Sequence, residues 1–313
     1  MAQESSILIT GGAGFIGSNV VEHLLANGYQ NLTVIDDESL GRLKRVDRPG
    51  VTCVKGDILD EALMASLLAG ADAVIHLAAD TRVIDSIENP AYNFEVNVVG
   101  SFRLLSLARD AGCQRIINAS TGGAILGDAP PPVSEELPAR PLAPYGAAKL
   151  AVEGYCSAFA GAYGMKTLSL RFSNVYGPLS FHKGSVVAAF YKSLLNGRPL
   201  TVYGDGEQVR DFLYVGDLVA GVRRAIETDA TGVLQLGSSV GTSINTLIAL
   251  MAEATGRREI PVDYVPARQG ETRITWCCID RAREVLGFEP GTRLAEGLAN
   301  TWNWFSENVT VFK

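Results

Sequence analysis

A strand pattern, a glycine-rich turn and a helix pattern open the chain. The apolar residues 7–10 lead directly into Gly11-Gly12-Ala13-Gly14-Phe15-Ile16-Gly17, and residues 15–27 then have helical apolar spacing. The glycines at 11, 14 and 17 allow a tight turn and let the backbone approach a pyrophosphate at the helix N-terminus. This strand–turn–helix unit belongs in a parallel sheet, so it predicts an α/β fold that binds a dinucleotide.

The second predicted strand, residues 32–36, ends in an acidic pair. Asp36 and Asp37 follow the last glycine by about 20 residues, the spacing at which a carboxylate accepts hydrogen bonds from the ribose hydroxyls. The same carboxylate would repel an added 2′-phosphate, which favours NAD over NADP. Two alternatives remain: the acids begin a loop, or the basic residues among positions 42–45 contact a phosphate.

Short strand patterns alternate with longer helical patterns through the first half of the chain. The predicted strands cover residues 7–10, 32–36, 51–54, 73–77, 115–119 and 167–171. The predicted helices cover residues 15–27, 60–69, 91–111 and 145–163. These six strands predict a Rossmann-type, doubly wound parallel sheet.

The pattern loosens after about residue 177 into segments punctuated by glycine and proline. Residues 200–203 are strand-like, and residues 217–228 and 244–255 are helix-like. We expect residues 1–176 to form an NAD-binding domain and residues 177–313 to form mainly a smaller C-terminal α/β substrate-binding lobe. Part of 205–235 is expected to return to the first domain.

Composition excludes several classes of function. The net charge of −7 and the isoelectric point near 5.1 oppose attraction to nucleic acid. The sequence has no apolar run of about 18 residues and no recognisable targeting segment, so we expect a cytoplasmic location without a membrane partner. His23, His76 and His182 are isolated, and the five cysteines lack metal-ligand spacing, so no metal is expected.

Tyr145 and Lys149 are the central candidate pair for chemistry. They lie four residues apart on a predicted helix and therefore share one face. A nearby ammonium favours the phenolate, so we expect Lys149 to lower the pKa of Tyr145 from the ordinary value of about 10. The phenolate could then take the proton of a sugar hydroxyl while hydride leaves the same carbon. The alternative is a surface tyrosine packed on a lysine stem.

At this point the sequence resembles the extended short-chain dehydrogenase/reductases, specifically the UDP-glucose 4-epimerase-like nucleotide-sugar enzymes. The resemblance spans almost the whole chain. Beyond the glycine turn and the Tyr145/Lys149 pair, it is carried by Gly56-Asp57, His76-Leu77-Ala78-Ala79, Asn97-Val98-Val99-Gly100, Arg171-Phe172-Ser173-Asn174-Val175-Tyr176-Gly177-Pro178, Val209-Arg210-Asp211-Phe212 and Ala267-Arg268-Gln269-Gly270-Glu271.

The resemblance implies a role for each of these residues. The cofactor would contact Gly11, Gly14, Phe15, Ile16, Gly17, Asp36, Asp37, Asp57, Ile58, Leu77, Ala78, Ala79, Asn97, Tyr145, Lys149 and Phe172. A UDP-sugar or another nucleotide-diphosphate sugar would contact Thr81, Asn174, Lys183, Val187, Tyr203, Arg210 and Arg268. The implied reaction oxidises the sugar to a 4-keto intermediate and returns hydride to the opposite face, so that bound NAD is regenerated.

The strand end before the catalytic helix departs from the family pattern. The usual catalytic Ser or Thr falls on Gly122, so we assign the hydroxyl role to Thr121, with Ser120 as the alternative, and expect Gly122 and Gly123 to let the loop bulge. No carboxylate follows Thr121, which favours an epimerase over a dehydratase or decarboxylase. Glu135 and Glu136 follow in a Pro-rich loop, where we expect solvent exposure.

Three alternatives to a UDP-hexose 4-epimerase remain open. Two are enzymes of related chemistry: a nucleotide-sugar 4,6-dehydratase, and a UDP-uronate epimerase or decarboxylase. The third is a sensor of dinucleotide or sugar nucleotide that has kept the fold without the activity. The predicted helices 91–111 and 145–163 are long and apolar on more than one face, which indicates a homodimer interface.

Overall fold

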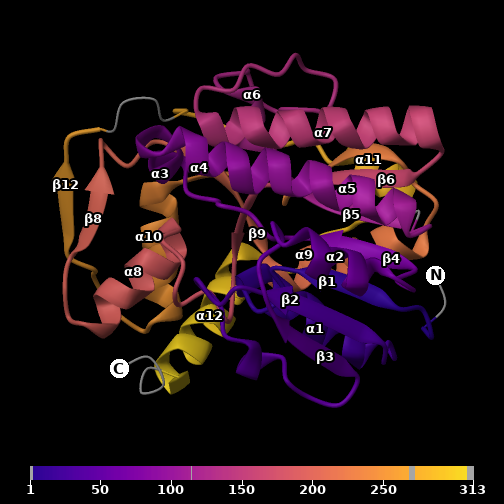
Figure 1. The fold of residues 1–313 in the computed structure, drawn as a ribbon. Coiled ribbons are helices and arrows are strands. Elements are labelled where there is room, and N and C mark those ends of the chain that lie inside the picture. Colours follow the sequence, from indigo (N-terminus) through magenta and orange to yellow (C-terminus); the bar gives the residue numbers. More distant parts are fainter. Residues whose placement is uncertain (1–2, 114, 268–271, 309–313) are drawn as a thin grey trace.

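A parallel sheet of seven strands forms the centre of the computed structural model, which describes residues 3–113, 115–267 and 272–308 (Figure 1). The strand order is β10-β6-β5-β4-β1-β2-β3. The strands are β1 (Ile7–Thr10), β2 (Leu32–Asp36), β3 (Val51–Lys55), β4 (Ala73–His76), β5 (Arg115–Thr121), β6 (Lys166–Phe172) and β10 (Gly232–Leu236). The order reverses between β1 and β4, and a doubly wound sheet binds its ligand at such a reversal.

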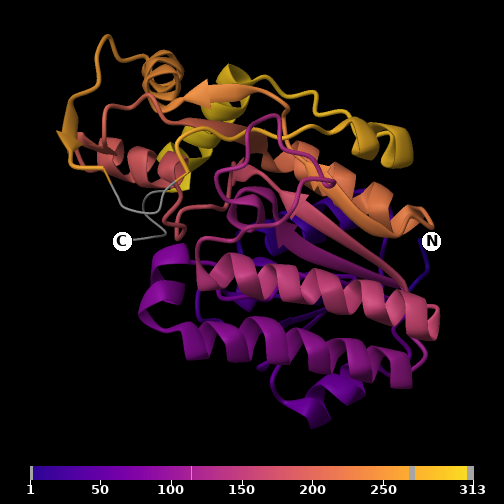
Figure 2. The same cartoon turned by 90° about the horizontal axis from the view of Figure 1, so that it is seen from above.

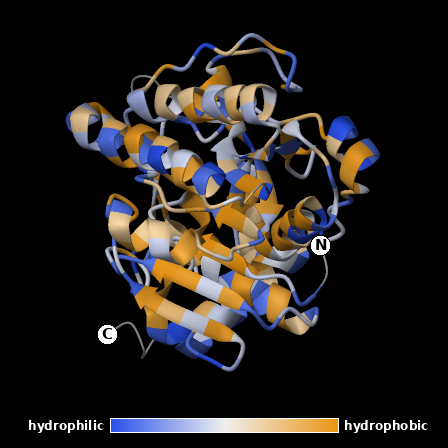
Figure 3. Cartoon of the chain, turned by 45° about the vertical axis from the view of Figure 1, so that its right-hand side comes forward, coloured by the Kyte–Doolittle hydropathy of each residue, from blue (hydrophilic) through white to orange (hydrophobic). Residues whose placement is uncertain are grey.

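Helices cover both faces of the sheet (Figure 2). One face packs on α1 (Phe15–Ala26), α9 (Val215–Glu227) and α11 (Asp280–Leu286). The other packs on α2 (Glu61–Leu68), α5 (Gly100–Asp110) and α7 (Pro144–Tyr163). Successive strand residues alternate between these two cores: Ile9 packs with the α1 side, whereas Leu8 packs with the α5 side. Both faces are therefore apolar, which explains the continuous apolar runs in the sequence and the hydrophobic sheet in Figure 3.

The six predicted strands are confirmed, but the predicted number of strands is wrong. The seventh strand, β10, comes from the second half of the chain and pairs in parallel with β6. Its helix α9 packs beside α1, so the chain returns to the first domain before it completes the second lobe. The buried polar residue Gln235 interrupts the apolar run of β10, which is why the sequence pattern did not predict it.

The predicted helix 91–111 is a helical run with an internal change of pitch. It consists of α4 (Pro90–Phe94), a π-helical turn (Glu95–Val99) and α5, and α3 (Val83–Glu88) precedes it. The π-helical turn contains the predicted cofactor-side residue Asn97. Such turns are frequent at functional sites because they reorient one side chain within a helix.

The second lobe has its own apolar core, which includes Tyr191, Phe212 and Phe305. Its strands are β7 (Asn174–Tyr176), β9 (Val209–Tyr214) and β11 (Gly241–Ser243) in one sheet, and β8 (Leu200–Tyr203) and β12 (Val262–Val265) in another. Its helices are α8 (Val186–Leu195), α10 (Ile244–Ala254) and α12 (Leu294–Asn308). Within the described parts of the chain, every helix is too short or too polar to span a bilayer.

Candidate active site

The glycine turn leaves no room for side chains where a phosphate would approach. Gly11 has φ +66°, and a Cβ there would lie 2.7 Å from the Ala78 backbone nitrogen. A Cβ on Gly17 would lie 2.4 Å from the Gly11 carbonyl oxygen. Gly14 begins α1 without a side-chain cap, and no acidic residue occupies the first turn of this helix. The first-turn N–H groups are thus suited to bind an anion, as the pyrophosphate of NAD requires.

Asp36 occupies the position predicted for the ribose-binding carboxylate. It is buried at the end of β2 and accepts hydrogen bonds from Ala13 N (3.0 Å) and Glu38 N (2.9 Å). Burial raises the pKa of Asp36, and these backbone bonds oppose that rise. Arg42 donates to the Glu38 and Gly41 carbonyls, both at 2.6 Å, so its guanidinium is already bonded within the loop. The loop therefore suits NAD better than NADP.

The remaining predicted adenosine contacts follow strand ends on the same side of the sheet. Asp37 is exposed and accepts a bond from Ser39 N (2.8 Å). Asp57 follows β3, is exposed, and accepts from Leu59 N (2.9 Å), whereas Ile58 is buried. These side chains leave carboxylate oxygens available at the surface of the turn.

A chain of hydrogen bonds runs beneath the glycine turn through His76, which is buried at the end of β4. Ser101 donates to the Asn97 carbonyl (2.5 Å), so its oxygen accepts from His76 Nε2 (2.9 Å). Nδ1 of His76 then accepts from the Thr10 hydroxyl (2.7 Å), which itself accepts from Ala78 N (3.2 Å). Burial lowers the pKa of His76 to about 3, so the imidazole is neutral at physiological pH.

Asn97 ties the π-helical turn to the loop after β4. Its side-chain oxygen accepts from Asp80 N, and its amide nitrogen donates to Asp80 O, both at 2.8 Å. Asn97 is 1% exposed. It therefore fixes the backbone just beyond Leu77, Ala78 and Ala79, which are partly buried along the predicted dinucleotide channel.

Tyr145 and Lys149 lie on one face of α7, as predicted. Lys149 is 4% exposed and donates from Nζ to the Ala119 carbonyl of β5 (2.9 Å). Tyr145 is partly exposed, and its backbone N–H donates to Ser86 Oγ (3.2 Å), which anchors the start of α7 against α3. The pair thus lies at the carboxyl end of β5, where a doubly wound sheet presents its ligands.

The expected lowering of the Tyr145 pKa is not found. Burial raises the pKa of Tyr145, and the charge of Asp80 adds to the rise. Burial also lowers the pKa of Lys149 to about 8. Burial therefore disfavours the ionised forms of both side chains.

The two candidate hydroxyl residues point to opposite faces of β5. Ser120 is buried and donates its hydroxyl proton to Glu153 Oε1 of α7 (2.6 Å), so its proton is engaged within the core. Thr121 is partly exposed at the last position of the strand, opposite Phe172 of β6. Of the two, Thr121 is the more exposed.

The expected loop bulge at Gly122 and Gly123 is wrong. Strand pairing continues through Thr121, and the glycines begin the short helix α6 (Gly122–Leu126). A Cβ on Gly122 would lie 2.5 Å from Gln235 Oε1. The glycine at the family's usual hydroxyl position therefore makes room for a side chain from β10, which the local sequence could not reveal.

The expected solvent exposure of Glu135 is also wrong. Its Oε1 accepts a hydrogen bond from the backbone N–H of Gln235 (2.6 Å), and the residue is partly buried. Glu136 is exposed, as expected. The Pro-rich loop is therefore attached to the edge strand β10, and one oxygen of the Glu135 carboxylate is engaged there.

The predicted substrate residues come from several parts of the site. Thr81 follows β4 and is partly buried, and Asn174 is exposed at the start of β7, two residues after the buried Phe172. Lys183 is partly buried in the loop before α8, and burial, together with the nearby Arg82, lowers its pKa. Thr81 thus follows a strand of the central sheet, whereas Asn174 and Lys183 belong to segments of the second lobe.

The other predicted substrate residues belong to the second lobe. Tyr203 is exposed at the end of β8, and Arg210 on β9 donates to the Val209 and Arg273 carbonyls (2.9 and 3.2 Å). Val187 is 1% exposed within the core of this lobe, so its side chain contributes to packing. Arg268 lies outside the described residues.

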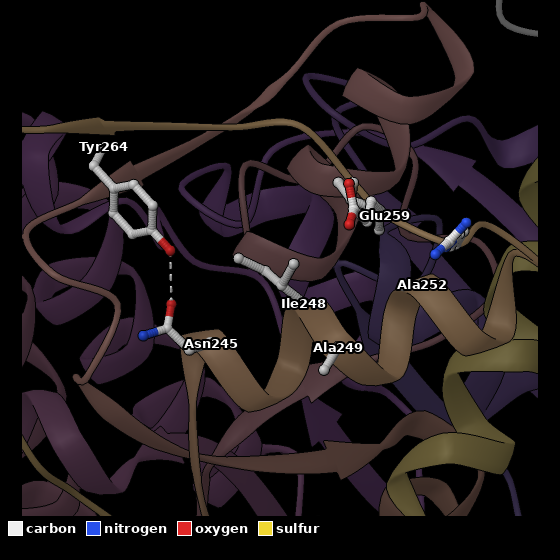
Figure 4. A pocket seen from close by; sticks show the side chains of 8 residues that line it. Asn245, Ile248, Ala249, Ala252, Glu259 and Tyr264 are labelled. Carbon is white, nitrogen blue, oxygen red and sulfur yellow. Dashed lines mark hydrogen bonds between the residues drawn. The ribbon is translucent and has the colours of Figure 1, made fainter.

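A separate hollow of about 370 Å³ lies on the second lobe (Figure 4). It is lined by residues of α10 and of the segment leading into β12, including Ile248 and Glu259. At one end, Tyr264 donates to Asn245 Oδ1 (3.1 Å). None of the predicted substrate residues lines it, so we do not assign it to the active site.

No group of three or more metal-ligating side chains occurs in residues 3–113, 115–267 and 272–308. Sequence reasoning gave no role in the site to four residues that organise it: Ser86, Glu153, Arg171 and Gln235. Arg171 had a signal as the first residue of the family motif 171–178, and Glu153 had one because it follows Lys149 by four positions on the same helix face. The others act through contacts between distant segments.

Comparison with known proteins agrees with this geometry. Residues 7–237 match the model of the NAD dependent epimerase/dehydratase family. The UDP-glucose 4-epimerase of Mycolicibacterium smegmatis is 38% identical over 308 residues, which cover 95% of this chain and 97% of that protein. The dTDP-glucose 4,6-dehydratase of Streptomyces antibioticus is 35% identical, with 97% of this chain and 93% of that protein covered.

Similarity to solved structures extends over the whole fold. The UDP-glucose 4-epimerase of Thermotoga maritima, solved with UDP-glucose, superposes with a TM-score of 0.92 and is 39% identical. The match covers 97% of this chain and 99% of that one. On the glycine turn, the Tyr145/Lys149 pair and these similarities, the chain belongs to the NAD-dependent epimerase/dehydratase family of extended short-chain dehydrogenase/reductases.

Proposed function

We propose that this enzyme interconverts two UDP-hexoses that differ at C4, with NAD as a resident cofactor. The observation that carries the proposal is the fixed placement of Lys149 on the Ala119 carbonyl, with Tyr145 one helical turn away. The two side chains lie at the carboxyl end of β5, and this position supports a role in proton transfer. Similarity to UDP-glucose 4-epimerases, one solved with UDP-glucose, supports the choice of substrate.

Each side chain has a distinct task in this reaction. Bound NAD would accept hydride from C4 and return it, so no net oxidation occurs. Tyr145 takes the C4 hydroxyl proton and later gives it back. Thr121 hydrogen-bonds the reacting oxygen and so positions it toward Tyr145. Lys149, held by Ala119, stabilises the phenolate form of Tyr145, which is the form that can accept this proton.

The surroundings of Thr121 favour epimerisation over dehydration. Elimination of water across C5 and C6 needs an acid and a base at these carbons. Gly122 and Gly123 supply neither group. Glu135, the nearby acid in sequence, has one oxygen bound to the Gln235 N–H at the sheet edge. Dehydration by a 4,6-dehydratase is accordingly the alternative reaction that product analysis must distinguish.

Homodimerisation through α5 and α7 and a cytoplasmic location complete the proposal. Phe102 of α5 and Tyr155 and Tyr163 of α7 are 40%, 41% and 50% exposed. The rings of Phe102 and Tyr155 lie 5.1 Å apart, so the two helices form one apolar surface. Such a patch on adjacent helices suits an isologous contact with a second copy. The free cysteines among the described residues fit a reducing compartment.

The reaction is tested by product analysis. We expect purified protein to convert UDP-glucose and UDP-galactose into each other without consuming added cofactor. Replacement of Tyr145 by Phe removes the proton carrier and should lower kcat by about 10²- to 10⁴-fold, with NAD still bound. The measurement is chromatography and mass spectrometry of products from UDP-hexose, UDP-N-acetylhexosamine and UDP-hexuronate. A product lighter by one water would assign the enzyme to the dehydratases.

The assignment of the hydroxyl is tested by a matched pair of variants. Thr121→Val keeps the shape of the side chain and should lower kcat by at least about 10-fold, because the reacting oxygen loses a hydrogen bond. Ser120→Ala removes one buried bond to Glu153, which should cost about 1–2 kcal/mol of stability and affect kcat less. Steady-state kinetics and thermal unfolding measure both effects. A larger kcat loss in Ser120→Ala would reverse the assignment.

The interface is tested by sedimentation equilibrium. We expect twice the mass of the chain at micromolar concentration, and a monomer for the double variant Phe102→Arg/Tyr155→Arg, because the charges would be buried in the contact. Val240→Arg is the matched control: Val240 is 59% exposed but lies outside α5 and α7, so the dimer should persist. A wild-type monomer at these concentrations would refute the proposed interface.

A further inference from the structure

The face of α7 that carries Tyr145 and Lys149 continues to Glu153. The three residues are spaced by four positions each, so they form one stripe toward β5 and β6. Glu153 is buried and forms a bidentate pair with Arg171 of β6, with Nε–Oε1 and Nη2–Oε2 distances of 2.9 and 2.7 Å. The side chains of this pair are each 5% exposed.

The pair joins the helix to both strands that hold the active site. Ser120 of β5 donates its hydroxyl to Glu153 Oε1 (2.6 Å). Ser120 and Arg171 are direct partners across the β5–β6 register, so both strands converge on the same carboxylate. The neighbouring residue on β5, Ala119, accepts the hydrogen bond of Lys149 Nζ. Two consecutive strand positions therefore hold Lys149 and Glu153.

A buried ion pair contributes little to the free energy of folding, because desolvation of the two charges offsets their attraction. Removing two charges from water costs several kcal/mol per ion, and well-packed apolar residues in its place are often as stable or more stable. The Glu153–Arg171 pair lies one helical turn from Lys149 and directly against the strand end that carries Thr121. This position indicates that the pair contributes to the site as well as to the core.

The carboxylate of Glu153 interacts electrostatically with the ammonium group of Lys149. The titratable groups that interact with Lys149 are Glu153 and Cys156 on α7 and His76 on β4. Burial raises the pKa of Cys156 to about 12 and lowers that of His76 to about 3, so both are neutral near pH 7. Cys156 and Glu153 both oppose the lowering of the Lys149 pKa by burial. Because the Cys156 thiol is neutral near pH 7, the carboxylate of Glu153 is the charge among these described groups that favours the ammonium.

We propose that Glu153, held by Arg171 and Ser120, is a positioning residue that keeps Lys149 in place and charged beneath the reacting hydroxyl. Arg171 and Ser120 fix the carboxylate against the strands, and Glu153 acts on the reaction only through Lys149. The proposal rests on the proposed function in one respect: the charged form of Lys149 is the form that supports Tyr145.

The direct test is a titration of Lys149 in the folded protein. The chain has seven lysines, so ¹³C-lysine labelling gives few signals, and the one missing in Lys149→Arg identifies Lys149. In Glu153→Gln we expect its pKa to fall by about one unit or more, because the opposing charge is lost. The alkaline limb of kcat/KM should move to lower pH with it, since activity is lost as Lys149 deprotonates.

Two further variants separate this role from a purely structural one. Glu227→Gln removes a carboxylate from the Arg223–Glu227 pair on α9 and should leave the Lys149 titration unchanged. Glu153→Leu/Arg171→Met replaces the whole buried pair by apolar side chains, which avoids an unpaired Arg171 if Glu153→Gln does not fold. We expect the Lys149 pKa to fall in this double variant too.

A folded variant without Glu153 in which Lys149 titrates at the wild-type pH would overturn the proposal and leave the pair a structural one. The titration needs no turnover, so it is independent of the reaction catalysed. If no sugar nucleotide is epimerised but the Lys149 pKa still falls in Glu153→Gln, the proposed function fails and this inference stands.

Discussion

The packing of α7 against the ends of β5 and β6 is the contact on which the site depends. Along one stripe of this helix, Tyr145 is partly exposed, Lys149 binds the Ala119 carbonyl, and Glu153 binds Ser120 and Arg171. Helix and strands thus fix each other at consecutive turns. A shift of α7 along its axis would break the polar contacts at two turns, so Lys149 and Glu153 are held by the core itself.

A second set of contacts fixes the cofactor side in the same manner. Thr10, His76 and Ser101 connect β1, β4 and α5 by hydrogen bonds whose directions are all determined, and Asn97 extends this chain to the loop after β4. Because burial keeps His76 neutral over the physiological pH range, this chain of hydrogen bonds keeps the same protonation state across that range. Buried hydrogen bonds therefore hold both halves of the site, which favours a pre-organised arrangement.

Much of the fold followed from local patterns, because those patterns have local causes. The glycine turn, six strands and the Tyr145/Lys149 spacing depend on residues close in sequence, and each was found where predicted. The features that were mispredicted depend on distant segments. The backbone N–H of Gln235 in β10 binds Glu135, which lies about a hundred residues earlier in the chain. The side chain of Gln235 occupies the space beside Gly122. The prediction of a lowered Tyr145 pKa was wrong because burial of the phenol raises this pKa, and the extent of burial depends on the whole fold.

The proposed epimerisation depends on a hydride that leaves C4 of the sugar and returns to the same carbon. The measurement that tests this step most directly is mass spectrometry of products from a UDP-hexose deuterated at C4, in ordinary water. We expect the C4 epimer to retain the full label at C4, because the hydride does not exchange with solvent. Loss of deuterium to water, or its appearance at C6 of a product that has lost water, would contradict the proposed epimerisation.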